Sequence, residues 1–441
     1  MLKVLKPSSE CETTSMHNFT SLLFGLDEFQ VIDVAPTTCP DLLRVVIEMI
    51  ETQAACPSCG VFSGGIKERP QRRIKDLPGS GQQVELWWRK RRLKCVEAEC
   101  PTQSFTQTSL AIAPGSRMTD RLLAKVALSI AKSNRSISDV CREYRVSWTT
   151  GNKALAAAVQ QWLPAPEPTR VLGIDETRAR SVKWVVEAES WKRTDPWMTS
   201  FVNADPNFSG RLLGLTPGRC GACVSTWLGK QTQEFRDGIE VVVIDPSAPY
   251  ACGIRSALPG VKIAVDHWHI IKLANQMVTD TRRRVIQEQQ GRRGQAIDPM
   301  WAHRLLLLTA AEHLSPKQRK RLNKVLDSQD PTGEIQAAYQ CKELLRKLLA
   351  TSNEPRLIRN RLFEFYTACA DANTVETIKL AKTIQTWWPA ILVFLQHRVT
   401  NARTEGFNRV IKQVKRTGCG YRNMDNYEKR IMSHIALNRA A

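Results

Sequence analysis

Four branched apolar residues and an acid form the run Val241-Val242-Val243-Ile244-Asp245. A continuous apolar run of this length is typical of a strand that is buried on both faces of a sheet. Residues 170–175 also read as a strand, and this one ends at Asp175. A carboxylate at the end of a buried strand is costly unless something offsets its desolvation, and a divalent cation would do so. For either aspartate alone, a solvated position in the loop past the strand remains the alternative.

A third acid stands near the C-terminal end, in the segment Asn401-Ala402-Arg403-Thr404-Glu405-Gly406-Phe407-Asn408-Arg409-Val410-Ile411-Lys412. The spacing i, i+4, i+7, i+11 places four polar residues on one helical face: Asn401, Glu405, Asn408 and Lys412. We expect DNA contacts from Asn401, Asn408 and Lys412. A different, apolar face is expected to pack into the core: Phe407, Val410, Ile411 and Val414. Three acids on two strands and a helix, Asp175, Asp245 and Glu405, can hold two Mg²⁺ ions about 3.5–4 Å apart for phosphoryl displacement. A solvated helix is the alternative.

Strands and helices alternate around the first two acids. We expect further strands at 182–188, 197–204 and 261–265, and a helical stretch at 224–236. After Asp266 the pattern is helical almost to the end of the chain, with helix-starting signals such as Ser315-Pro316. The pattern therefore predicts a mixed sheet with flanking helices, followed by a largely helical region.

The segment Asp266-His267-Trp268-His269 adds a D-x-x-H pair just beyond the strand at 261–265. Asp266 and His269 could bind a metal, and an aspartate at a strand end competes with Asp245 for the second catalytic place. A supporting part next to the metal ligands is the other interpretation of the pair. Glu176 directly follows Asp175 and is expected to point to the opposite face of the strand.

Four cysteines form two closely spaced pairs, Cys56-Pro57-Ser58-Cys59 and Cys95-Val96-Glu97-Ala98-Glu99-Cys100. Zn²⁺ takes four thiolates in a tetrahedron, and two such pairs on turns can supply them. The sequence therefore predicts one structural Zn²⁺ held by Cys56, Cys59, Cys95 and Cys100. Buried cysteines that act as small apolar residues are the alternative. A lone C-x-x-C at Cys220 and Cys223 has no second pair near it and gets no assigned role.

Helical spacing begins at Thr119. We expect a first helix through Leu122, a short second helix opened by Ser136, and a third that Ser147 caps and that runs to about Gln161. A helix, a short helix, a tight turn and another helix make a helix-turn-helix plausible, although any three-helix unit could share the pattern. In the third helix we expect DNA contacts from Trp148, Asn152 and Lys153.

The chain is strongly basic. It carries 63 Lys and Arg against 43 Asp and Glu, a formal charge of +20, and such an excess favours a polyanionic partner. The densest basic run follows two tryptophans, and we expect DNA contacts from Arg89, Lys90, Arg91 and Arg92. A solvated edge strand is the alternative for this run. No basic amphipathic helix for anionic lipid stands near either end.

The length of 441 residues predicts more than one domain, and the proline-rich run at 164–168 is the clearest linker. We expect five segments: a β-rich zinc-binding domain at 1–115, a helix-turn-helix domain at 116–163, a first part of the core at 164–270, a helical insertion at 271–397, and the rest of the core at 398–441. This is a multidomain α+β and α/β fold class. The sequence has no apolar run long enough to span a bilayer, no export signal core, and an odd number of cysteines, thirteen. A soluble intracellular protein is expected.

Several of these segments resemble one protein family. The segments VLGIDETR, VVVIDPSAPY, VKIAVDHWHIIKLAN, LSPKQRKRLNKVL and NARTEGFNRVIKQVKRTGCGYRNMDNYEKRI are similar to the DDE transposases of bacterial insertion sequences. The branch is the one with a four-cysteine zinc finger and a helix-turn-helix before the catalytic core. The resemblance runs from about residue 29 to 437. It implies an RNase H-like core, metal ligation by Asp175, Asp245 and Glu405, and a helical insertion between the last two. It also favours a supporting part for Asp266 and His269, next to the metal ligands rather than among them.

The function expected from residues and resemblance together is DNA transposition. The terminal inverted repeats would be bound by the N-terminal modules, and Mg²⁺-dependent (or Mn²⁺-dependent) strand cleavage and strand transfer would follow in the core. We expect at least a homodimer on double-stranded DNA, no nucleotide cofactor because no phosphate-binding loop is present, no membrane partner, and a cytoplasmic, nucleoid-associated bacterial location. A sequence-specific DNA-binding regulator and a metal-dependent nuclease without strand transfer are the alternatives.

Overall fold

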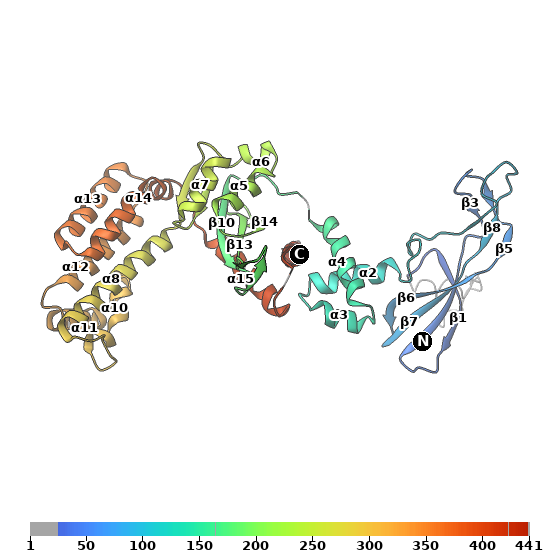
Figure 1. Ribbon diagram of the computed structural model, residues 1–441, viewed down its shortest axis with the longest axis horizontal. Helices are drawn as coiled ribbons and strands as arrows, with labels where there is room; N and C mark the ends of the chain where they lie inside the picture. The colour runs from blue at the N-terminus through green and yellow to red at the C-terminus, as the bar shows by residue number, and fades with distance from the viewer. Residues whose placement is uncertain (1–24, 164, 422, 440–441) are drawn as a thin grey trace, which may run out of the picture. The chain divides into compact units, whose positions relative to one another are not determined.

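The computed structural model describes residues 25–163, 165–421 and 423–439 (Figure 1). The start of the predicted zinc-binding domain, residues 1–24, lies outside the described residues. The chain divides into two compact units, Met1–Pro164 with Ser433–Ala441, and Ala165–Met432. The division falls in the proline-rich run, and the last residues belong with the first unit, whereas all of 398–441 was predicted to belong to the core. Within the described residues, no helix is long and apolar enough to cross a membrane.

The first unit begins with a sheet of order β1-β2-β7-β6, in which β2 and β7 are parallel and the other neighbours antiparallel. Its strands are β1 (Phe29–Pro36), β2 (Leu42–Met49), β6 (Gln71–Gly79) and β7 (Gln82–Arg89). Alternate residues of these strands, such as Val45, Ile47 and Leu86, form a buried core. The β-rich character predicted for the N-terminal region is confirmed.

Short strands carry the cysteine pairs. The pieces are β3 (Ala54–Ala55), β4 (Phe62–Ser63), β5 (Ile66–Glu68), β8 (Arg92–Lys94) and β9 (Ser104–Thr106). They form a two-stranded hairpin, β3-β4, and a small sheet of order β5-β8-β9. Leu93 and Phe105 pack there against Cys56 and Cys100 in a small separate core. A core this small is a poor source of stability by itself, which favours a bound metal.

Three helices follow in the first unit: α2 (Asp120–Ala131), α3 (Ile137–Glu143) and α4 (Trp148–Trp162). Ser136 and Ser147 cap α3 and α4 by accepting hydrogen bonds from the amides of Asp139 and Thr150. The predicted helix starts are therefore confirmed. Gly151 lets α4 pack close to α3, because a Cβ atom there would lie 2.4 Å from Cys141 Sγ.

The second unit is built on a mixed sheet of order β14-β13-β10-β15-β16. The strands are β10 (Val171–Arg178), β13 (Trp197–Asn203), β14 (Arg211–Pro217), β15 (Val241–Ile244) and β16 (Lys262–Val265). The strands β10, β15 and β16 are parallel, and β13 and β14 complete the sheet in antiparallel fashion. Three helices lie beside this sheet (Figure 1): α5 (Gly221–Gly229), α6 (Gln233–Asp237) and α7 (Ala248–Ala257). A mixed sheet with flanking helices is what the sequence predicted.

Three expectations for this sheet need correction. The predicted strand at 182–188 is shorter and lies outside the main sheet, in a hairpin of β11 (Trp184–Glu187) and β12 (Ser190–Arg193). The strand β14 was not predicted, because its central Gly214 breaks the apolar pattern. A Cβ atom on Gly214 would lie 2.4 Å from Trp227 Nε1, so the strand needs a glycine beneath the indole ring. The helix predicted at 224–236 is two helices, α5 and α6.

The helical region leaves the sheet along α8 (His267–Gln290) and returns along α14 (Val375–His397), which packs against both β16 and α8. Between them lie α9 (Pro299–Ala302), α10 (Arg304–Leu308), a 3₁₀ turn (Ala311–His313), α11 (Pro316–Gln329), α12 (Glu334–Leu349) and α13 (Pro355–Ala372). Ser315 and Gln318 form the capping box that starts α11. The chain ends with α15 (Ala402–Thr417) and α16 (Met424–Arg439). The predicted helical insertion is present.

Candidate active site and zinc site

The first two acids lie side by side where the parallel pairing of β10 with β15 ends. The strand β10 itself continues to Arg178, so the prediction that this strand ends at Asp175 is wrong. The register pairs Ile174 of β10 with Ile244 of β15, so the next residue of each strand path, Asp175 and Asp245, meets the other at the same edge. Asp175 Oδ1 accepts a hydrogen bond from its neighbour's amide, Glu176 N, at 2.7 Å. The carboxyl edge of a parallel strand pair is where open α/β sheets bind ligands.

The surroundings of Asp175 disfavour its ionised form. Burial raises the pKa of its carboxyl group to about 7, and the nearby charge of Asp245 adds to the rise. The ionised form is therefore costly unless a positive charge is near. Glu176 responds in the same direction, because burial and the Asp245 charge raise its pKa too. From the sequence, Glu176 was expected only to point to the opposite face of the strand. The structure adds that the charge of Asp245 acts on its carboxyl group.

The helix α15 docks directly on β10. A Cβ atom on Gly173 would lie 2.3 Å from Thr404 Oγ1 and 3.1 Å from Asn401 Oδ1, so glycine is needed for this close approach. Asn401 Nδ2 donates to the carbonyl oxygen of Ile174 at 3.3 Å. One end of the helix is thus bonded to the residue that precedes Asp175.

Two turns further along α15, Asn408 holds the carboxylate itself. Asn408 Nδ2 donates to Asp175 Oδ2 at 2.7 Å, and its Oδ1 accepts from Ser200 Oγ of β13 at 3.1 Å. Asn401 and Asn408 are both buried, so the prediction that they contact DNA is wrong. Their buried amide groups join the helix to the strand, while Lys412 on the same face remains exposed. The DNA contact predicted for Lys412 stays a prediction.

Glu405 lies on α15 between the two asparagines and is half-buried. Its place in the i, i+4, i+7 series with Asn401 and Asn408 directs it to the side of the helix that faces β10. Groups of at least three His, Cys, Asp or Glu with ligand atoms within 4.8 Å of one another are found in two places in the described part of the chain, and Glu405 belongs to neither. In the described residues the three acids therefore do not form a closed ligand set, and metal ligation by all three stays a prediction.

One of those two groups contains Asp245, Asp266 and His269. His269 Nε2 lies 2.9 Å from Asp245 Oδ2, and His269 Nδ1 lies 3.8 Å from Asp266 Oδ2. Asp266 caps α8 by accepting from the amide of Trp268 at 3.1 Å. The hydrogen bond to Asp245, together with Asp266, raises the pKa of His269 to about 10. A histidinium held between two carboxylates fixes the orientation of Asp245.

Asp266 is the most deeply buried member of this group, and its carboxyl group is ionised. Burial acts to raise its pKa, but the neighbouring His267 and His269 rings outweigh burial and lower it. Asp245 Oδ1, by contrast, is buried with no hydrogen-bond partner. An orphaned carboxylate oxygen beside a second, desolvated carboxylate fits a divalent cation.

The second ligand group is the four cysteines, which the structure brings together as predicted. The Sγ atoms of Cys56 and Cys100 are 3.8 Å apart, and those of Cys59 and Cys95 are 3.6 Å apart. A tetrahedron with metal–sulfur bonds of about 2.3 Å has edges of about 3.8 Å. Burial acts to raise the pKa of Cys56, but the amides of Cys59 and Ser58 and the neighbouring thiols lower it to about 7. The cluster fits one Zn²⁺.

The basic run after Trp88 is divided by its environment. Arg91 is buried, and its guanidinium donates to the carbonyl oxygens of Met49 and Glu51 and pairs with Glu48 at 2.9 Å. The DNA contact predicted for Arg91 is therefore wrong. The other three residues remain at least partly accessible: Arg89 is exposed, Lys90 Nζ lies 4.2 Å from the centre of the Trp88 ring, and Arg92 pairs with Glu68.

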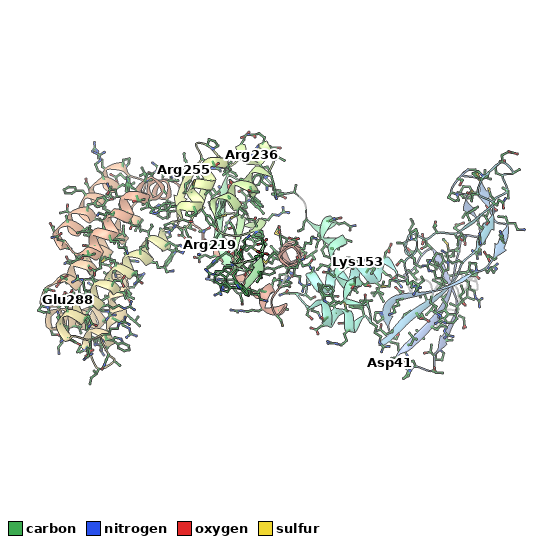
Figure 2. The ribbon with its side chains drawn as sticks, in the orientation of Figure 1. Asp41, Lys153, Arg219, Arg236, Arg255 and Glu288 are labelled. Atoms are coloured by element: carbon green, nitrogen blue, oxygen red, sulfur yellow. The ribbon has the colours of Figure 1, made fainter. Side chains whose placement is uncertain are left out.

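The residues predicted to contact DNA from α4 differ in exposure. Trp148 is 51% exposed. Lys153 is exposed and projects from α4, as Figure 2 shows, and Asn152 is half-buried. These positions leave the predicted contacts open to a ligand.

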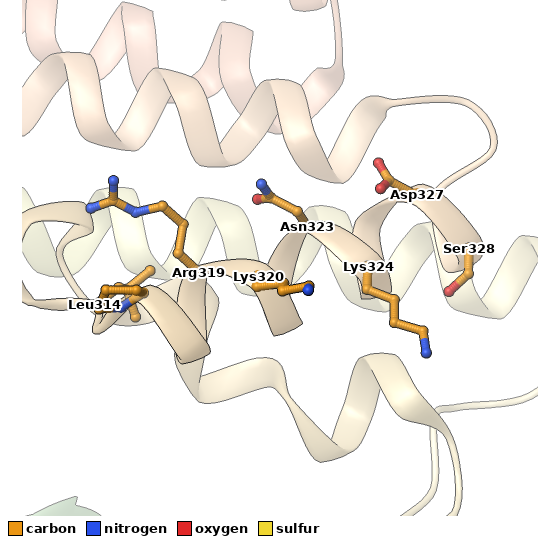
Figure 3. A pocket seen from close by; sticks show the side chains of 8 residues that line it. Leu314, Arg319, Lys320, Asn323, Lys324, Asp327 and Ser328 are labelled. Atoms are coloured by element: carbon orange, nitrogen blue, oxygen red, sulfur yellow. The ribbon is translucent and has the colours of Figure 1, made fainter.

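A groove of about 1000 Å³ lies along α11, away from the acids (Figure 3). Its lining includes three cations, Arg319, Lys320 and Lys324, and one acid, Asp327. The groove has no paired carboxylates, so it has no means of holding a divalent cation as the sheet edge does. Its charge adds to the basic surface of the insertion.

Comparison with known proteins matches three parts of the chain. Residues 172–431, more than half of the length, match a family described as a transposase. Residues 52–100 match the zinc-finger of transposases IS204, IS1001, IS1096 and IS1165, and residues 106–150 match the helix-turn-helix domain of transposase family ISL3. The chain is 24% identical over 386 residues to the transposase for insertion sequence element IS1001 of Bordetella parapertussis, covering 87% of this chain and 89% of that protein.

Proposed function

This chain belongs to the ISL3 family of transposases, and from that premise we propose that it cuts DNA at the ends of an insertion sequence and joins the freed ends to target DNA. Asp175, Asp245 and Glu405 are proposed as the metal ligands of both steps. The observation that carries the proposal is the pairing of Ile174 with Ile244. It supports a shared site because it brings two acids to one edge, next to the helix that carries the third.

The residues at this edge fit a divalent cation. Asp245 Oδ1 is buried without a partner, and the pKa of Asp175 is raised by burial and by the Asp245 charge. When bound, two Mg²⁺ or Mn²⁺ ions would lower the pKa of the attacking water or 3′-hydroxyl and balance the charge on the phosphate. Asp175, Asp245 and Glu405 would hold them, with oxygen ligands of the kind that Mg²⁺ prefers.

Neighbouring side chains prepare these acids for their task. Asn408 holds Asp175 Oδ2 and leaves Oδ1 toward the backbone amide of Glu176. His269 holds Asp245 Oδ2 at 2.9 Å and leaves Oδ1 for a ligand. We therefore assign Asp266 and His269 a supporting part, in agreement with the expectation from the sequence.

The first unit supplies DNA recognition. A helix-turn-helix and a zinc ribbon match the family's own modules, and Trp148, Lys153 and Arg89 are exposed for contacts with DNA. We propose that these modules bind the terminal inverted repeats. Because two ends must be joined, we propose at least a homodimer during catalysis. We propose that the protein works in the bacterial cytoplasm, with the nucleoid.

The test is a cleavage assay with end DNA of the element and Mg²⁺, followed by mapping of nicks on each strand. We expect a nick at the element boundary and, with target DNA, joined products. Binding of the ends without any nick, with Mg²⁺ or Mn²⁺ present, would favour a DNA-binding regulator. Nicks without joining would favour a nuclease.

A further inference from the structure

A small hairpin between β10 and β13 exposes two tryptophans. The strands β11 and β12 pair with each other, and in the described part of the chain no other strand joins them. Trp184 is 61% exposed and Trp191 is 69% exposed. An isolated two-stranded hairpin is only marginally stable in water, and exposed indole rings add nothing to its core. Two exposed tryptophans on such a hairpin therefore indicate a surface that binds a ligand.

The register places both tryptophans on one face of the hairpin. Trp184 pairs with Arg193, and Val186 pairs with Trp191. Because residues i and i+2 of a strand share a face, these four residues lie together. The opposite face carries Val185 and an ion pair of Lys192 with Glu187 at 3.1 Å. The hairpin therefore has an aromatic face with a cation at its edge.

The hairpin leaves the sheet at the same edge as the catalytic acids. Its neck continues the β10–β13 pair, because the amides of Ala179 and Lys183 donate to Pro196 O at 2.8 Å and to Thr194 Oγ1 at 2.9 Å. Trp184 is nine residues after Asp175, so the two Cα atoms are no more than about 30 Å apart. That is within the reach of one DNA end bound at the acids.

The net positive charge of the hairpin segment indicates which kind of ligand it binds. The segment from Arg178 to Arg193 holds five cations and two acids, and one of those acids is paired with Lys192. A second copy of the chain would bring the same excess of positive charge to the face, which opposes self-association through it. Nucleic acid brings the opposite charge and a flat ring at every base. In an intact duplex the base faces are covered, so indole rings can stack only on bases that have left the helix.

We propose that the β11–β12 hairpin is a binding site for unpaired DNA bases, with Trp184 and Trp191 as the stacking platform. The proposal rests on the proposed function, since it makes the hairpin the holder of bases opened next to the scissile phosphate. Strand opening there would let a single strand enter the carboxyl edge of β10. The helix-turn-helix, by contrast, would bind the paired part of the end.

The first test measures the full-length protein with a fluorescein-labelled 12-nucleotide oligo(dT), by anisotropy, without Mg²⁺. The salt concentration is kept near 0.3 M to weaken contacts that depend on phosphate alone. The double variant Trp184→Ala/Trp191→Ala should bind at least about 10-fold more weakly, because it loses two stacking rings. Trp184→Phe/Trp191→Phe should stay within about 3-fold, since it keeps two aromatic faces.

Two controls separate stacking from other causes. Val185→Ala, on the opposite face, should leave oligo(dT) binding unchanged, and binding of a 30-base-pair duplex should be unchanged in every variant. Equal oligo(dT) affinity for the wild-type protein and the double alanine variant would overturn the proposal. So would a change in self-association by sedimentation with no change in oligo(dT) binding, because the hairpin would then be an interface between copies.

The second test links the hairpin to cleavage. On a fully paired element end, the double alanine variant should cut at least about 10-fold more slowly, and an end with mismatches at the cleavage site should restore the rate. A slow rate on both substrates would overturn the role in strand opening. Failure of the wild-type protein to cut either substrate would instead overturn the proposed function, and the oligo(dT) result would still decide whether the hairpin binds bases.

Discussion

The two candidate metal centres of this chain are assembled in different ways. The four cysteines lie between residues 56 and 100, and their sulfur atoms already stand at tetrahedral spacing. The acids are spread from residue 175 to residue 405, and they form no closed ligand set in the described part of the chain. Protonated thiols are neutral and can approach one another without an ion, whereas carboxylates repel until a cation is bound.

The two centres also differ in which parts of the chain position their ligands. The zinc site depends on two turns in a short segment and on a small core around Leu93. The acid centre depends on a helix brought back from the far end of the insertion and fixed by Gly173, Asn401 and Asn408. A change of one ligand should therefore damage folding at the first centre and chemistry at the second.

The largest effect is expected at the zinc site. Cys56→Ser should lower the zinc content from about one ion per chain to near zero, because structural zinc sites require all four ligands. Metal analysis and hydrogen exchange of residues 52–107 are the measurements. Cys39→Ser, an exposed cysteine of the same unit, is the matched control. Full zinc content in the Cys56 variant would contradict the ribbon assignment.

At the acid centre the same kind of change should spare the fold. Asp175→Asn, Asp245→Asn and Glu405→Gln should each lower the cleavage rate by about 1000-fold or more, since the ligands of the catalytic ions are lost. Binding of end DNA and the melting temperature should be nearly unchanged or improved. Glu364→Gln, an exposed acid on α13, is the control. Cleavage at the wild-type rate by all three variants would rule out this set of ligands.

Asp175 should also give the acid centre a pH dependence that the variant lacks. Its pKa of about 7 lies above the usual value, so the folded state prefers the protonated form. The resulting stability is fully present below about pH 4 and is lost as the pH rises through 7. Without Mg²⁺, the free energy of unfolding of the wild-type protein should fall relative to that of Asp175→Asn by up to about 4 kcal/mol.

Urea unfolding at a series of pH values, with the two proteins side by side, measures this difference. Added Mg²⁺ should restore stability to the wild-type protein at high pH and leave Asp175→Asn unaffected, because the cation offsets the repulsion between Asp175 and Asp245. If the difference in the free energy of unfolding does not change with pH, the pKa of Asp175 is not raised in the folded protein.

The smallest effect is expected from the residue that holds Asp245. His269→Ala should raise the metal concentration needed for half-maximal cleavage by about 10- to 100-fold, the usual cost of removing a partner of a metal ligand. His269→Gln, which keeps a hydrogen-bond donor, should recover part of the loss. Titration of cleavage with Mn²⁺ is the measurement, with His313→Ala, exposed on the 3₁₀ turn, as the control. A loss of cleavage that no amount of metal repairs would make His269 a ligand itself.

Local features were predictable from the sequence, because their signals stand within a few residues. The apolar run before Asp245 is β15, Ser136 and Ser147 start their helices, and the cysteine pairs meet as expected. Each depends on a neighbour in sequence or on a known ligand geometry. Spacing alone was enough for them.

Features that depend on partners far away in sequence were not predictable. The helical face of Asn401 and Asn408 was identified correctly, but its partner is β10 rather than DNA. Arg91 lies in a basic run and is buried against Glu48 of the distant strand β2. The strand β14 depends on Trp227, which fills the space above Gly214. In each case the deciding atom belongs to a segment that the local pattern does not contain.

The most direct test of the central claim, that three distant acids hold the catalytic cations, is a crystal structure with Mn²⁺ and its anomalous signal. We expect a Mn²⁺ ion bound by oxygen atoms of Asp175, Asp245 and Glu405, at about 2.0–2.2 Å. A Mn²⁺ ion bound by Asp245, Asp266 and His269, with Asp175 and Glu405 turned away from it, would contradict the claim.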